Sequence, residues 1–171
     1  MGELLEIILT STVVSAIISS VVALVLKNVD FKNEYYKEII KKRLEAYGYV
    51  ERQIAVLKSS AIDDDNKPCH LIFFYGADKF LEFQDNLFAA MSYGMWIDKE
   101  TIKELERLND LFFTINCKIK NKTETELINI GKEYHKTILT SRNNLEQATK
   151  KGLYEITNMK KMFKVTKQKN K

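Results

Sequence analysis

Apolar residues are arranged in two different ways along this chain. Residues 7–26 form a run of 20 positions without a charged side chain, and no comparable run follows it. After this run, apolar positions recur every three or four residues in four segments, which is the period of amphipathic helices. The chain contains one Pro and six Gly, and so few breakers favour helices over a turn-rich β fold. The pattern predicts an all-α protein.

The N-terminal run has the length of a membrane span. At about 1.5 Å per residue, a helix of this length covers about 30 Å, the thickness of a hydrocarbon core. Glu3 and Glu6 precede the run, whereas basic residues follow it from Lys27 onward. The positive-inside rule then places the N-terminus outside the cell and the rest of the chain in the cytoplasm. We therefore expect a single-pass cell-membrane protein with its anchor at residues 1–28.

Two other interpretations of the run stay open. A cleaved signal peptide usually has a basic start and a shorter apolar core, and this chain has neither. A buried helix of a soluble protein is the other alternative, because the Ser and Thr content lowers the hydropathy of the run.

Small residues recur every four positions within the run. This spacing lets two helix backbones approach closely and lets hydroxyl groups bond across the contact. It predicts self-association, although small residues are also common in membrane helices that do not associate. The residues concerned are Ser11, Ser15, Ser19 and Ala23.

The four amphipathic segments predict an antiparallel four-helix bundle at residues 29–164, followed by a basic disordered tail at 165–171. The segments cover about residues 31–59, 70–93, 98–119 and 123–163, and the short connections between them favour antiparallel neighbours. Asp98 is a suitable N-cap for the third helix. Thr123 and Glu126 have the spacing of a capping box at the start of the fourth. Gly131 and Gly152 fall on the apolar seam of that helix, where they allow close packing.

Aromatic residues are concentrated in one part of the bundle. Eight of the 18 aromatic residues lie between Phe73 and Trp96. One helix cannot point all of them toward a single core. Either two neighbouring helices cover both faces, which a four-helix bundle readily does, or some of these side chains meet a partner.

Positive charge gathers at the C-terminus, although the net charge is only +4. From Lys150 to Lys171 there are eight Lys and one acid, which suggests an anionic partner. Anionic lipid is favoured over nucleic acid because few aromatic residues lie among these lysines. In an up-down-up-down bundle, this end and the Trp96 turn return to the membrane. The predicted headgroup contacts are Lys160, Lys161, Lys164, Lys167 and Trp96.

No motif for catalysis or metal binding rises above background. Cys69, His70, Cys117 and His135 contain no C-x-x-C pair of the kind that structural zinc sites use. They also match no local motif of a Cys–His nucleophile pair. The acidic turn at residues 63–66 fails the calcium-loop pattern, which needs Gly and Glu at its sixth and twelfth positions. We expect no cofactor, no metal and no enzymatic activity.

The layout resembles small single-span helical proteins of AT-rich Gram-positive bacteria and their prophages. The likeness rests on layout and composition rather than on a motif, so it implies no site residues. The leading hypothesis is a membrane-tethered, self-associating interaction or scaffold module that binds an unknown protein partner. A prophage or antiphage-defence setting fits this role. An oligomeric pore-forming or membrane-perturbing effector is the alternative, and an anchored enzyme is the third.

Overall fold

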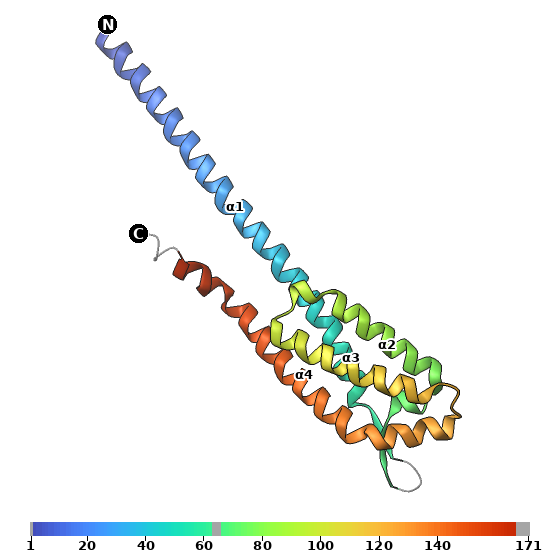
Figure 1. Ribbon diagram of the computed structural model, residues 1–171. Helices are drawn as coiled ribbons and strands as arrows, with labels where there is room; N and C mark the ends of the chain where they lie inside the picture. The colour runs from blue at the N-terminus through green and yellow to red at the C-terminus, as the bar shows by residue number, and fades with distance from the viewer. Residues whose placement is uncertain (1, 63–65, 167–171) are drawn as a thin grey trace. The chain divides into compact units, whose positions relative to one another are not determined.

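The computed structural model describes residues 2–62 and 66–166, and within them the side chains of 19–62 and 66–156. The chain is 87% helical, which confirms the prediction of a helical protein. Within the described residues there are four α-helices, two short 3-10 helices and one two-stranded sheet (Figure 1). Their bounds are α1 Gly2–Lys58, β1 Ser60–Ile62, β2 Pro68–His70, η1 Leu71–Phe73, α2 Gly76–Ser92, η2 Gly94–Trp96, α3 Lys99–Ile119 and α4 Glu124–Thr166.

The chain divides into two compact units, Met1–Lys41 and Lys42–Lys171. The second unit contains the hydrophobic core, to which the last third of α1 and the helices α2, α3 and α4 all contribute. Phe112 of α3 lies at its centre, because its ring packs 5.5 Å from Phe80 and 4.7 Å from Phe83 of α2. The fully buried side chains of this core also include Tyr47, Leu57, Phe73, Leu87, Leu105, Leu108, Ile115, Leu127, Ile138 and Leu145.

The helical stripes expected from the sequence are mostly the buried faces. In α3, the predicted positions from Leu105 to Ile119 are all buried, because a spacing of three and four residues keeps them on one side of the helix. Leu44 is an exception, since half of its side chain is exposed. The core-facing position near it on α1 is Tyr47.

The sequence did not predict the β-hairpin that precedes α2. Residues 70–93 were expected to form one helix, but β2 occupies Pro68–His70 and pairs antiparallel with β1, with Ala61 opposite Cys69. Proline lacks an amide hydrogen and is therefore confined in sheets to positions such as the first residue of a strand, which is where Pro68 lies in β2. The amide of Leu71 then bonds the carbonyl of Ser59 at 3.0 Å, which closes the hairpin against the end of α1.

Both predicted helix starts are confirmed. The Asp98 carboxylate accepts hydrogen bonds from the amides of Glu100 and Thr101, at 2.9 and 3.0 Å. At the start of α4, the amide of Thr123 donates to Glu126 at 2.9 Å, and the amide of Glu126 donates to the Thr123 hydroxyl at 3.3 Å. These bonds satisfy amides that have no partner inside the helix.

For the residues that the structure describes, the predictions of a transmembrane anchor and of a cell-membrane localisation are wrong. No helix among them combines the length and the apolar character that a membrane crossing needs. The prediction depended on residues 7–26, and the side chains of 7–18 lie outside the described ones. The described remainder, 19–26, is an uncharged stretch of about 12 Å, which falls short of a bilayer core of about 30 Å. After Lys27 the same helix is amphipathic and charged.

Candidate interaction surfaces

The predicted self-association residues lie on the first unit and are only partly described. The side chains of Ser11 and Ser15 lie outside the described residues. Ser19 and Ala23 are exposed on α1. All described side chains from residue 19 to residue 35 are exposed, so this part of α1 presents every one of its faces to solvent.

The same segment carries a second pattern, which we did not predict. Val22, Leu26 and Val29 have alternating separations of four and three residues, which is the a/d spacing of a coiled coil. Continued along the chain, the spacing includes Asn33, Tyr36 and Ile40. The three apolar side chains remain 50%, 57% and 48% exposed, respectively. We call residues Val22, Leu26, Val29 and Asn33 the α1 seam.

Other apolar residues of this segment lie off the seam. Leu24 and Phe31 take the outermost position of the heptad, and they are 62% and 70% exposed. Because they make the helix apolar on its other faces too, the heptad spacing does not stand out as a separate apolar stripe in the sequence. They also provide natural controls for the seam.

Trp96 lies in η2, where residues of α1 hold it within the second unit. The Arg43 guanidinium donates from Nε to the Trp96 carbonyl at 3.1 Å, and Lys42 Nζ lies 5.2 Å from the centre of the indole ring. These contacts give Trp96 a structural role at the end of the bundle. The side chains of Lys160, Lys161, Lys164 and Lys167 lie outside the described residues.

A polar cluster joins α1, α3 and α4 near Trp96. The Tyr47 hydroxyl donates to Asp98 Oδ2 at 2.6 Å, and the Thr101 hydroxyl donates to the same oxygen at 2.5 Å. Burial opposes ionisation of Asp98, but the bonds from Thr101 and Tyr47 outweigh it and hold the pKa of Asp98 below its usual value. Burial and the same carboxylate raise the pKa of Tyr47. A side-chain atom added at Gly152 would overlap Tyr47 and Asp98, so α4 needs glycine there.

The four Cys and His residues do not form a metal site. His70 and His135 are stacked, with ring centres 4.6 Å apart, so their nitrogens do not converge on one point. Cys69 is buried and Cys117 is exposed, and neither forms a disulfide. Among the described residues, no group of three or more His, Cys, Asp or Glu side chains has the arrangement of a metal site.

Burial controls the protonation of His70. Its side chain is fully buried, and its Nε2 atom has no hydrogen-bond partner. Burial, followed by the nearby charges of His135 and Arg142, lowers the pKa of His70 to about 4. The ring is therefore neutral at pH 7. Its Nδ1 lies 3.3 Å from the Ser60 hydroxyl, which connects the two strands of the hairpin.

A groove of about 610 Å³ runs between α1 and α2 within the second unit. Its walls include the apolar side chains of Val56, Ile72 and Phe83. The cations at its edge are already engaged: Lys79 pairs with Glu82 at 2.5 Å, and the Arg52 guanidinium lies 5.3 Å from the Tyr49 ring centre. The lining also contains polar side chains, among them Gln53, Ser59 and Asn86.

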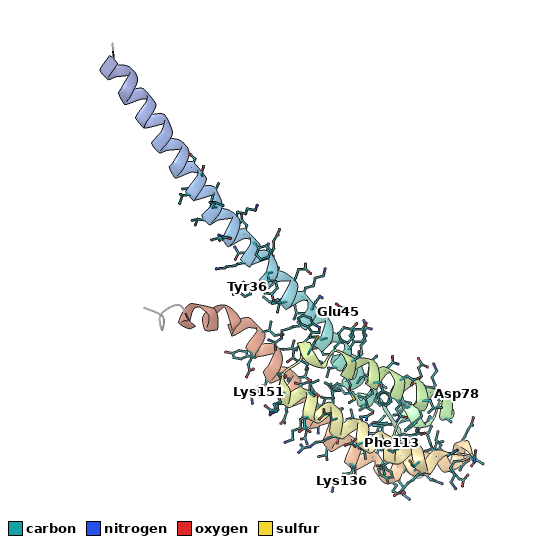
Figure 2. All side chains as sticks on the ribbon, turned by 45° about the horizontal axis from the view of Figure 1, so that its top comes forward. Tyr36, Glu45, Asp78, Phe113, Lys136 and Lys151 are labelled. Carbon is teal, nitrogen blue, oxygen red and sulfur yellow. The ribbon has the colours of Figure 1, made fainter. Side chains whose placement is uncertain are left out.

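The outer side of α2 and α3 carries exposed aromatic residues. The Asn116 amide of α3 donates to the Gln84 carbonyl oxygen of α2 at 3.0 Å. Phe88 and Phe113 are 51% and 59% exposed, and Leu81 is 44% exposed. Phe113 lies in the second half of α3 and is labelled in Figure 2. Some of the clustered aromatic residues therefore face solvent, as one of the two sequence interpretations allowed.

Comparison of the chain with protein-family models, curated proteins and solved structures found no match. Three unpartnered features stand out among the described side chains: the α1 seam, the groove between α1 and α2, and the aromatic residues outside α2 and α3.

Proposed function

We propose that this chain is a non-enzymatic, self-associating helical scaffold whose α1 seam pairs with the same seam on other copies. The single observation that carries the proposal is the exposure of Val22, Leu26 and Val29 at coiled-coil spacing on a helix. The pore-forming alternative relied on a transmembrane span, and no described helix has the length and apolar character of one.

A helix with this composition is not expected to stay stable alone in water. Most helical stability in proteins comes from packing of an apolar face, and residues 19–35 of α1 bury none of their side chains. About half of each seam side chain is still exposed. Burying that half against another copy gains on the order of 1 kcal/mol per side chain.

Asn33 favours a parallel, in-register pairing. It occupies an a position of the heptad, seven residues after Leu26. A polar residue at heptad position a fixes the register of a coiled coil at some cost in stability. In a parallel pair, the two Asn33 side chains face each other across the axis and can hydrogen-bond to one another. An apolar residue opposite Asn33 would leave these polar groups without a hydrogen bond. The scaffold would bring several copies of the bundle together.

The test compares the same substitution on and off the seam. Val29→Asp places a charge in the proposed contact, whereas Phe31→Asp places it at the outermost position two residues away. Size-exclusion chromatography with light scattering on the full chain gives the mass. We expect an oligomer for the wild type and for Phe31→Asp, and a monomer for Val29→Asp. Circular dichroism checks that all three retain their helical content.

Two results would overturn the proposal. One is a wild-type chain that stays monomeric over the whole concentration range in which it is soluble. The other is equal behaviour of Val29→Asp and Phe31→Asp, because this would show that the heptad seam has no special part in association.

A further inference from the structure

Phe88 of α2 and Phe113 of α3 are exposed on the same flank of the contact between these two helices. The bond between Gln84 and Asn116 fixes the level at which the two antiparallel helices meet. Phe88 follows Gln84 by four residues, and Phe113 precedes Asn116 by three, so both rings lie about one turn away from that bond in the same direction. Leu81 lies about one turn away in the other direction. We call Leu81, Phe88 and Phe113 the aromatic face.

The flank of α3 that carries Phe113 is not the flank that meets α4. Lys118 of α3 pairs with Glu133 of α4 at 3.0 Å, and helical periodicity puts Lys118 about 100° or more away from Phe113 around the axis. Two exposed phenylalanines on one outer face are typical of a protein-binding surface, where buried aromatic side chains supply much of the affinity.

Negative charge borders the aromatic face. Asp85 follows Gln84 on the outer side of α2, and Asp110 lies on the outer side of α3, three residues before Phe113. Both are exposed, and no ion pair is formed by either one among the described residues. Glu106 and Asp78 add two further exposed carboxylates on these flanks. The chemistry of the surface therefore suits an apolar segment that carries basic residues.

The chain itself contains such a segment. Residues 157–171 hold six Lys and no acid, and Met159, Met162 and Phe163 supply apolar side chains among them. We propose that the C-terminal segment 157–171 of one copy docks on the aromatic face of a second copy. The apolar side chains would contact Phe88 and Phe113, and the lysines would pair with Asp85 and Asp110.

A second copy fits better than the same chain. α4 is helical as far as Thr166, so residues 157–166 continue along the helix beyond Gly152. Gly152 packs near Asp98 at the start of α3, and Phe113 lies 15 residues further along α3, about 22 Å back toward the other end of the bundle. A helix that continues past Asp98 leads away from Phe113. This docking uses a different surface from the α1 seam and does not depend on it.

The exposed thiol of Cys117 offers a probe beside the aromatic face. It lies one turn after Phe113 on α3, whereas Cys69 is buried and protected from labelling. One full-length copy carries a bimane fluorophore on Cys117. The other full-length copy carries Cys117→Ser and Phe163→Trp, because a tryptophan quenches bimane only when the two are in contact. Unlabelled chain with Phe163 intact gives the baseline.

We expect bimane fluorescence to fall when the two copies are mixed and to recover at high salt, which screens the charge pairs. Asp85→Lys with Asp110→Lys in the labelled copy should abolish the quenching. The matched control, Glu38→Lys with Glu51→Lys, reverses two exposed carboxylates of α1 and should leave the quenching unchanged. The comparison is repeated with Val29→Asp in both copies, where quenching should persist even if the α1 seam no longer associates.

Three outcomes would overturn the docking proposal. The first is the absence of quenching between the mixed copies. The second is quenching that both charge-reversed pairs reduce equally, since this would reflect overall charge rather than the aromatic face. The third is quenching that occurs only when the fluorophore and the tryptophan are on the same chain. Circular dichroism of each variant confirms that the bundle is folded when the fluorescence is read.

Discussion

The Tyr47 hydroxyl donates a hydrogen bond to Asp98 Oδ2 at 2.6 Å and accepts one from the Asp98 amide at 3.2 Å. A single side chain of α1 therefore contacts both the carboxylate that caps α3 and the backbone that precedes it. Tyr47 is 1% exposed, so water does not readily replace either bond. This contact connects the first and third helices of the bundle at the level where Gly152 lets α4 approach closely.

Removing the Tyr47 hydroxyl should destabilise the bundle. For Tyr47→Phe we expect a loss of about 1–3 kcal/mol in the free energy of unfolding, because the Asp98 carboxylate would lose a donor in a partly buried site. Chemical denaturation measures this loss of unfolding free energy. Tyr75→Phe is the control, since Tyr75 is 63% exposed and should behave like wild type. Equal stability of the two variants would contradict the role given to the Tyr47–Asp98 bond.

Two glycines should respond to alanine in opposite ways. Gly152→Ala forces a methyl group against Tyr47 and Asp98, and we expect a loss of about 1–3 kcal/mol despite the better helix propensity of alanine. At Gly48 there is no atom within 4 Å of an added Cβ, so Gly48→Ala should gain up to about 1 kcal/mol. Thermal or chemical unfolding measures both. A stabilised Gly152→Ala would show that the close approach of α4 is not required.

Acid should destabilise the second unit through His70. Its pKa is about 4 in the folded chain and about 6.5 in the unfolded chain, so the unfolded chain binds more protons between these values. The contribution of neutral His70 is present above about pH 6.5 and is lost as the pH falls toward 4, with a total of about 3 kcal/mol. Denaturation at a series of pH values measures how steeply the free energy of unfolding changes with pH.

The variant His70→Phe isolates this contribution. It should remove most of the slope between pH 6.5 and 4, while the part that comes from carboxylates remains. Glu126 and Glu146 belong to that part: bonds from Lys122 and Thr123 lower the pKa of Glu126 to about 2, and Lys150 and Lys58 do the same for Glu146. An unchanged slope in His70→Phe would show that other groups cause the acid sensitivity.

Salt should strengthen the association of the α1 seam if the copies are parallel. In that arrangement Lys32, just before Asn33, faces Lys37 of the other copy, and their repulsion is screened as ionic strength rises. An antiparallel arrangement would instead bring Asp30 near Lys37, and salt would weaken it. Analytical ultracentrifugation at low and high salt distinguishes the two. Dissociation promoted by salt would contradict the parallel register.

Replacing Asn33 should change the specificity of the seam. We expect Asn33→Leu to raise the stability of the oligomer, because an apolar side chain replaces a polar one in the contact, and to broaden the distribution of oligomer sizes. Sedimentation velocity measures both. A variant with unchanged stability and a single size would place Asn33 outside the contact.

The sequence predicted the helices and their caps more accurately than the segments between them. The stripe of α3 and the capping box of Thr123 and Glu126 depend on spacing within a few residues, which is visible in the chain itself. The hairpin was missed because Pro68–His70 is extended only through pairing with Ser60–Ile62, a contact that leaves no periodic signal in such short strands. The length of the apolar run suggested a membrane span, and this proved wrong among the described residues.

The amino-acid sequence by itself determined the helical character of the protein, the positions where α3 and α4 begin, and the glycines that lie on the seam of α4. Local spacing and local hydrogen bonds decide these features, so one segment contains the whole signal. Only the tertiary structure decided that Tyr47 meets Asp98, that His70 stacks on His135, and that Phe88 and Phe113 share an outer face. Those relationships join residues far apart in the chain, and packing of the core sets their distances.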